Sequence, residues 1–169
     1  MMPFPATIAL CIMLLSPATY GASPISLLKP VGSATLSVVF WDIYHSTLYS
    51  SDGNYTDAQR PVALQIEYLR DIDAEDLLEA TAEEWDKLAI AKDVYQPWLK
   101  NLRVIWPDIK EHDTLLFVLK SDQSTEFYFN HTRLGSFDDK DFGSNFLRIW
   151  LDPKASYPKL RKQLIGKSK

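Results

Sequence analysis

The sequence predicts a single α+β domain, in which an antiparallel sheet is covered on one face by helices. Three observations support this fold class. Segments with the alternation of strands are grouped along the chain, amphipathic helical segments come in pairs, and no repeat or long linker divides the sequence. Grouped strands and helices are typical of α+β folds, whereas regular alternation of the two is typical of α/β folds with parallel sheets.

The predicted sheet begins with two strands in the first half of the chain. Residues 34–49 are rich in β-branched, aromatic and aliphatic side chains, and turn chemistry follows at 50–54, which contains Asp-Gly. After Pro61, residues 62–71 alternate between apolar and polar side chains. Such alternation predicts one buried face and one mostly wet face. The face predicted to be buried carries Val62, Leu64, Ile66, Tyr68 and Arg70.

A change of period marks two helices in the middle of the chain. Asp73 is of the residue type preferred at an N-cap, and apolar residues follow at helical spacing as far as Ala89. A second helix is predicted over Tyr95–Trp106, with Pro97 in its first turn and Pro107 ending it.

The last third of the chain predicts a hairpin and two more helices. Strands at 114–120 and 125–130 are joined by a polar turn, and residues 133–135 are predicted to lie in the next turn. Helices are predicted over 140–151 and 158–165. The acidic run before the first of them lacks the carboxylate spacing of an EF-hand, so we interpret it as an acidic N-terminal helical turn.

The N-terminal segment, residues 1–22, is predicted to be a signal peptide. Residues 1–28 contain no Asp, Glu, Lys or Arg and include a continuous apolar run that small residues follow. This is the layout of a secretory signal with cleavage near Gly21 or Ala22. An uncleaved anchor would need about 20 apolar residues. Cleavage would leave one domain over 23–169, remove the single Cys11, and place the protein outside the cytoplasm, in a bacterial periplasm.

The net charge and the absence of standard motifs argue against several classes of function. The net charge of −4 argues against a nucleic-acid partner, because proteins that bind nucleic acid usually carry a basic field. The three histidines, His45, His112 and His131, lie in different predicted elements without the spacing of metal ligands. No Gly-x-Ser-x-Gly elbow is present. We therefore expect no cofactor, no metal and no catalytic residue of a standard class.

Candidate ligand-binding residues come from the covered face of the sheet. Alternation would place Arg70 there, where its guanidinium needs a carboxylate, a carbonyl or a ligand anion to offset its desolvation. A neighbouring Asp or a helix C-terminus is the alternative partner. Tyr44, Tyr68 and Trp41 combine apolar rings with polar tips, as residues that line ligand clefts do.

Several stretches together resemble a known family. They are Val31–Leu36, Phe40–Tyr44, Leu64–Ile72, Phe127–Asn130 and Phe146–Pro153. In this order and spacing, over roughly residues 27–166, they resemble the secreted bacterial chalcone isomerase-like proteins. The resemblance implies an open-faced β-sandwich, in which helices cover a large antiparallel sheet and a ligand cleft lies between them. Plant members of the family isomerise chalcones to flavanones without a cofactor, related plastid members bind fatty acids, and others assist partner enzymes.

The resemblance does not carry the enzymes' catalytic residues with it. Ser37 stands where the enzymes have an Arg, Tyr44 stands near their Thr, and Asp73 and Ala80 stand near their Tyr and Asn. Loss of the Arg removes the cation that would stabilise a phenolate or enolate. We therefore expect no catalytic residue, and we treat Ser37 as a candidate ligand-binding residue of the cleft.

Three functions remain open at this stage. The first is a cell-envelope protein that binds a hydrophobic or amphipathic small molecule, such as a fatty acid. The second is a cofactor-independent isomerase or lyase that acts through Tyr44 and Arg70 on an unknown substrate. The third is an envelope protein that stabilises a partner and holds no ligand.

Overall fold

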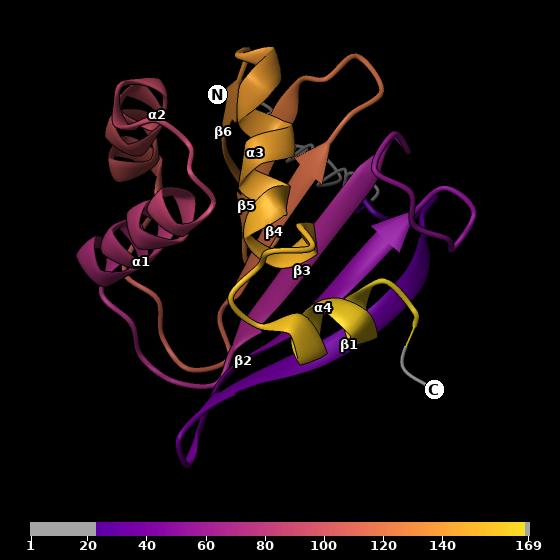
Figure 1. Ribbon diagram of the computed structural model, residues 1–169, viewed down its shortest axis with the longest axis horizontal. Coiled ribbons are helices and arrows are strands. Elements are labelled where there is room, and N and C mark those ends of the chain that lie inside the picture. The colour runs from indigo at the N-terminus through magenta and orange to yellow at the C-terminus, as the bar shows by residue number, and fades with distance from the viewer. Residues whose placement is uncertain (1–22, 168–169) are drawn as a thin grey trace, which may run out of the picture.

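The computed structural model describes residues 23–167, so the predicted signal peptide lies outside the described residues. The strands of this part form one antiparallel sheet in the order β1-β2-β3-β4-β5-β6, and the helices cover one of its faces (Figure 1). The strands are β1 (Lys29–Val38), β2 (Trp41–Ser50), β3 (Val62–Tyr68), β4 (Thr114–Leu119), β5 (Thr125–Phe129) and β6 (Thr132–Phe137). The helices are α1 (Ala74–Lys87), α2 (Lys92–Ile105), α3 (Lys140–Leu151) and α4 (Pro158–Leu164). The predicted α+β class is confirmed.

The alternation predicted for β3 is confirmed over its length. Val62, Leu64 and Ile66 are buried in the main core beneath the helices, whereas Ala63 belongs to a smaller cluster on the opposite face. Successive side chains of a strand point to opposite faces, so this pattern fixes which side of the sheet the helices cover.

Two turns in the structure differ from the prediction. The stretch predicted as one strand, 34–49, is split between β1 and β2, which a tight turn at Val39-Phe40 connects. The stretch 133–135, predicted as a turn, lies in the edge strand β6, and the preceding turn is made by Asn130 and His131 at positive φ. The first turn contains none of the residues that usually mark one, and in the second case the turn forms at Asn130 while Gly135, which suggested a turn, lies in β6.

The ends of two other elements also differ from the prediction. Helix α2 begins at Lys92, so Pro97 lies inside the helix rather than in its first turn. Strand β3 ends at Tyr68, so Arg70 lies beyond the sheet, and the alternation used to orient it no longer applies there. The interpretation of the acidic run is confirmed, because Asp139 caps α3 by accepting a hydrogen bond from the backbone N–H of Asp141.

An aromatic cluster fills the space between α3, α2 and strands β4 to β6. Phe142 of α3 stacks on Phe137 with ring centres 4.0 Å apart. Trp85 donates from Nε1 to the backbone oxygen of Asn145 at 3.0 Å, and Trp98 donates to Asp139 at 2.7 Å. These bonds tie α1 and α2 to α3. The cluster comprises Trp85, Trp98, Trp106, Phe117, Phe127, Phe137, Phe142 and Phe146.

No helix within residues 23–167 has the length and apolar character needed to cross a membrane.

Candidate functional site

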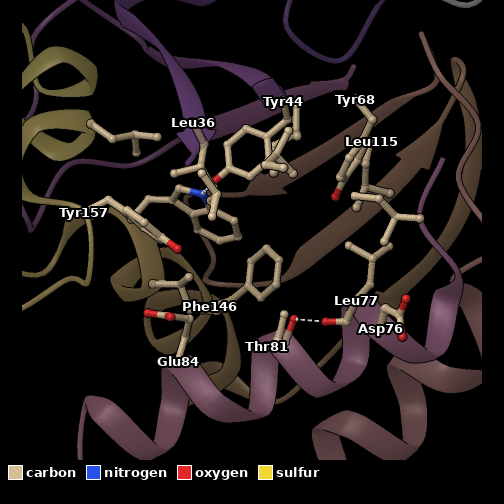
Figure 2. Close-up of a pocket in the computed structure, with 18 of the residues that line it drawn as sticks. Leu36, Tyr44, Tyr68, Asp76, Leu77, Thr81, Glu84, Leu115, Phe146 and Tyr157 are labelled. Carbon is tan, nitrogen blue, oxygen red and sulfur yellow. Dashed lines mark hydrogen bonds between the residues drawn. The ribbon is translucent and has the colours of Figure 1, made fainter. Parts of the chain in front are cut away.

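A cavity of about 350 Å³ lies where the aromatic cluster ends, between strands β1 to β4 and helices α1 and α3 (Figure 2). Its volume falls within the range of about 300–1,000 Å³ that is usual for small-molecule pockets. The sheet side is formed by Leu36, Tyr44, Ile66, Tyr68 and Leu115. The helical side is formed by Leu77, Ala80, Thr81, Phe146, Ile149 and Trp150. The space that the fold leaves between sheet and helices is thus packed at one end and open at the other.

Two phenol hydroxyls are the polar groups on the sheet side of this cavity. Tyr44 accepts a hydrogen bond from Nε1 of Trp150 at 2.8 Å, and its ring meets that of Tyr68 edge to face at 6.0 Å. The side chain of Tyr68 points into the cavity (Figure 2), and only 3% of the residue is exposed. Within residues 23–167 no group hydrogen-bonds its hydroxyl, which therefore faces the cavity without a partner.

Burial keeps both phenols in their neutral form. It raises the pKa of Tyr44 and of Tyr68 well above the ordinary value, because a phenolate would lose its hydration in this apolar space. Both hydroxyls are therefore protonated at neutral pH.

The helical side of the cavity carries two carboxylates, one exposed to solvent and one paired with a lysine. Asp76 and Glu84 of α1 lie on its wall, and Glu84 accepts hydrogen bonds from Lys87 at 2.8 Å and Ser156 at 2.6 Å. Thr81 is satisfied locally, since its hydroxyl donates to the backbone oxygen of Leu77 at 2.7 Å. Among the described residues that line the cavity there is no Lys, Arg or His. An anionic group inside it would meet no cation.

The structure brings together only some of the residues singled out from the sequence. Tyr44 and Tyr68 both line the cavity. Ser37 does not, because it lies between Leu36 and Val38, which line the cavity, and successive strand residues point to opposite faces; Ser37 is exposed and donates to Asp42. Ser37 therefore lies outside the cavity that Tyr44 and Tyr68 line.

Arg70 and Trp41 do not line the cavity either, and Arg70 does not lie on the covered face of the sheet where alternation placed it. Arg70 is exposed beyond the end of β3, and its guanidinium lies 5.2 Å from the centre of the Trp41 ring, which is itself 64% exposed. This is a cation–π contact at the surface rather than an anchor inside a cleft. Asp71, a candidate partner for Arg70, is paired with Lys110 at 2.9 Å instead.

Sequence reasoning missed the helical wall of the cavity. Leu77 and Thr81 of α1 fit a helical apolar stripe, and such a stripe predicts contact with the core but not a gap beside it. Ala80 carried the one available signal, since the resemblance placed it near a catalytic Asn of the enzymes, and in the structure it lies on the cavity wall.

Comparison with known proteins identifies the family to which the chain belongs. The family model described as chalcone isomerase-like matches residues 25–166. The chain belongs to the chalcone isomerase-like family. The resemblance inferred from the sequence is thereby confirmed, along with the open-faced sheet-and-helix architecture that it implied.

Two known proteins are similar to this chalcone isomerase-like chain. An uncharacterized protein of Haemophilus influenzae is 29% identical to it over 150 residues, covering 89% of this chain and 74% of the relative. A solved structure of an Arabidopsis thaliana fatty-acid binding protein is similar with a TM-score of 0.64 at 10% identity, covering 89% of this chain and 91% of that chain. At that identity the structural likeness shows a shared fold.

Proposed function

We propose that this chalcone isomerase-like protein binds a hydrophobic small molecule in the cavity between its sheet and helix α1. The main support for the proposal is the cavity itself. Beside a closely packed core it leaves about 350 Å³ of space with a mostly apolar lining, and the hydroxyl of Tyr68 points into this space. An empty space of this size would lower stability, because its lining loses packing contacts. The fatty-acid binding protein with the same fold adds support.

The polar groups of the cavity favour a ligand whose polar end is uncharged. The neutral hydroxyls of Tyr44 and Tyr68 can hydrogen-bond a hydroxyl, a carbonyl or a protonated carboxyl group. A carboxylate would find no cation among the described residues of the lining, and burial of an unpaired charge is strongly unfavourable. A fatty acid fits this cavity as the neutral acid, or with its carboxylate at the mouth in water.

The second function considered from the sequence, an isomerase or lyase acting through Tyr44 and Arg70, loses its geometric basis. Tyr44 lies in the cavity and Arg70 does not. For the location, our proposal remains the cell envelope of a bacterium, on the basis of the signal peptide predicted for residues 1–22.

Native mass spectrometry of the purified protein tests the proposed function. The protein is extracted with organic solvent, refolded, and mixed with hexadecanol, hexadecanoate or no lipid. We expect one molecule of hexadecanol to be retained per chain, with weaker retention of hexadecanoate at neutral pH. A folded protein that retains neither compound would contradict the proposal.

Replacing Ala80 with tryptophan should abolish ligand retention without unfolding the protein. Ala80 lies on the cavity wall yet is solvent-exposed on α1, so an indole there would fill the cavity mouth rather than overpack the core. The matched control is Val104→Trp, at an exposed position of α2 that does not line the cavity. Native mass spectrometry should show loss of hexadecanol in the first variant alone. Equal retention by both variants would place the ligand elsewhere.

Replacing Tyr68 with phenylalanine should weaken binding of hexadecanol by about three- to tenfold, the usual contribution of one hydrogen bond. Binding of hexadecane, which has no polar end, should stay the same or improve, because the variant keeps the ring and removes only the hydroxyl. Displacement of a fluorescent probe measures both affinities. A parallel loss for alcohol and alkane would mean that Tyr68 contributes shape alone.

A further inference from the structure

The turn between β1 and β2 exposes four consecutive apolar residues. The exposed fractions are 40% for Val38, 82% for Val39, 93% for Phe40 and 64% for Trp41, and we call these four residues the apolar tip. The hairpin projects beyond the rest of the sheet (Figure 1). Turns of this kind normally carry Asn, Asp or Gly, so both the residue types and their exposure are unusual.

The backbone of the apolar tip is unfavourable for its sequence. Val39 has φ of +58°, in the left-handed region that β-branched residues rarely adopt. An Asn or Gly would relieve this strain and remove exposed apolar surface at the same time. Neither local backbone preference nor burial within residues 23–167 therefore explains why valine and phenylalanine occupy the turn.

The shape and chemistry of the apolar tip fit a bilayer surface. A stable protein interface buries about 800 Å² on each partner, which the narrow end of one hairpin does not offer. Phenylalanine and tryptophan side chains enter the interfacial region of a bilayer readily. Arg70 lies over the ring of Trp41, 5.2 Å from its centre, and this places a cation beside the apolar residues where an anionic headgroup would meet it.

The apolar tip is also continuous with the cavity, since Val38 belongs to both. We propose that the apolar tip inserts into the surface of a phospholipid bilayer that contains anionic lipids, with the cavity facing the membrane. Exchange of a ligand between cavity and bilayer rests on the proposed function, whereas the docking itself does not. The net charge of −4 gives no long-range attraction to such a surface, so insertion of apolar side chains supplies the affinity.

A matched pair of variants tests the docking. Val39 and Val104 are both valines with 82% of their surface exposed, one in the apolar tip and the other on α2. Val39→Asp is not expected to disturb the fold, because Asp tolerates a positive φ better than valine does. Val39→Asp should lower cosedimentation with vesicles of phosphatidylethanolamine and phosphatidylglycerol about tenfold or more, and Val104→Asp should leave it unchanged.

Tryptophan fluorescence gives a second readout. Trp41 is exposed, Trp85, Trp98 and Trp106 are buried, and Trp150 is half-buried on the cavity wall. A blue shift on adding vesicles that the Val39→Asp substitution removes therefore reports on the apolar tip. We expect the shift in the wild-type protein and in Val104→Asp, and its absence in Val39→Asp.

Two outcomes would overturn the docking proposal. One is a wild-type protein that neither sediments with vesicles nor shifts its emission, which is also what a tip that binds only another protein would give. The other is an equal loss in both variants. Retention of hexadecanol in the absence of vesicles is measured on the same samples. If it persists while vesicle binding fails, only the docking proposal is wrong, and if it is lost alone, only the proposed function is wrong.

Discussion

Replacing Gly32 with alanine is expected to lower the free energy of unfolding by about 3 kcal/mol or more, the upper end of the range for overpacking. A Cβ atom at this position would lie 2.1 Å from the backbone oxygen of Gln163 and 2.8 Å from that of Leu164. Backbone atoms at the end of α4 cannot rotate away as a side chain can, so β1 and α4 must separate. Leu160 of α4 lines the cavity, and ligand retention should fall as well.

Thermal and urea denaturation measure this effect against a matched control. Gly135→Ala places its Cβ 3.2 Å from a side-chain methyl of Ile105, which can shift, so we expect a loss within about 1 kcal/mol. For a chain of this length, the Gly32 variant should melt roughly 6–12 °C below the wild type. Equal midpoints for the Gly32 variant and the wild type would show that β1 and α4 do not approach this closely.

Replacing Phe142 with alanine should lower the free energy of unfolding by about 3–5 kcal/mol, the usual loss for a buried Phe. The side chain is fully buried, stacks on Phe137 and contacts the aromatic rings of α1, α2 and the sheet. Its removal would leave a hole that these rigid neighbours cannot close. The loss is large beside a total stability of about 5–15 kcal/mol.

The control for this variant is another phenylalanine in the same chain. Phe40→Ala changes a residue that is 93% exposed, so its free energy of unfolding should stay within about 0.5 kcal/mol of the wild-type value. A Phe142→Ala protein as stable as Phe40→Ala would mean that the aromatic cluster is not the main core of the fold.

Periodicity predicted those parts of the fold in which one side of an element is buried. The alternation from Val62 to Tyr68 and the helical stripe from Phe142 to Trp150 directly reflect burial under or within the helical layer. Such patterns predict structure because apolar residues recur on the side of the element that faces the core, and polar residues recur on the side that faces water.

The remaining parts of the fold could not be predicted because their signals are absent or misleading. The turn at Val39-Phe40 has no turn residue and continues an apolar run, so the two strands read as one. Arg70 was oriented by an alternation that stops when β3 ends at Tyr68. In both cases the strand-like pattern of the sequence extends past the residue at which the strand ends.

The candidate site was predicted in part, for a related reason. Residues on the sheet side, Tyr44 and Tyr68, follow from strand alternation and residue type. The opposite wall depends on how far α1 stands from the sheet, and α1 is bonded through Trp85 to the backbone of α3. Whether a cavity forms depends on this distance between helix and sheet. An apolar helical stripe has the same sequence pattern whether the space beside it is filled or open.

A crystal structure of the protein with a bromine-labelled long-chain alcohol is the sharpest test of ligand binding in the cavity. The anomalous signal locates the hydrocarbon tail, and the density locates the hydroxyl. We expect the tail between the sheet and α1, with the ligand hydroxyl within hydrogen-bond distance of the Tyr68 hydroxyl. Density for a tightly bound ligand at another place on the protein, with the cavity between Tyr68 and Ala80 empty, would contradict the account.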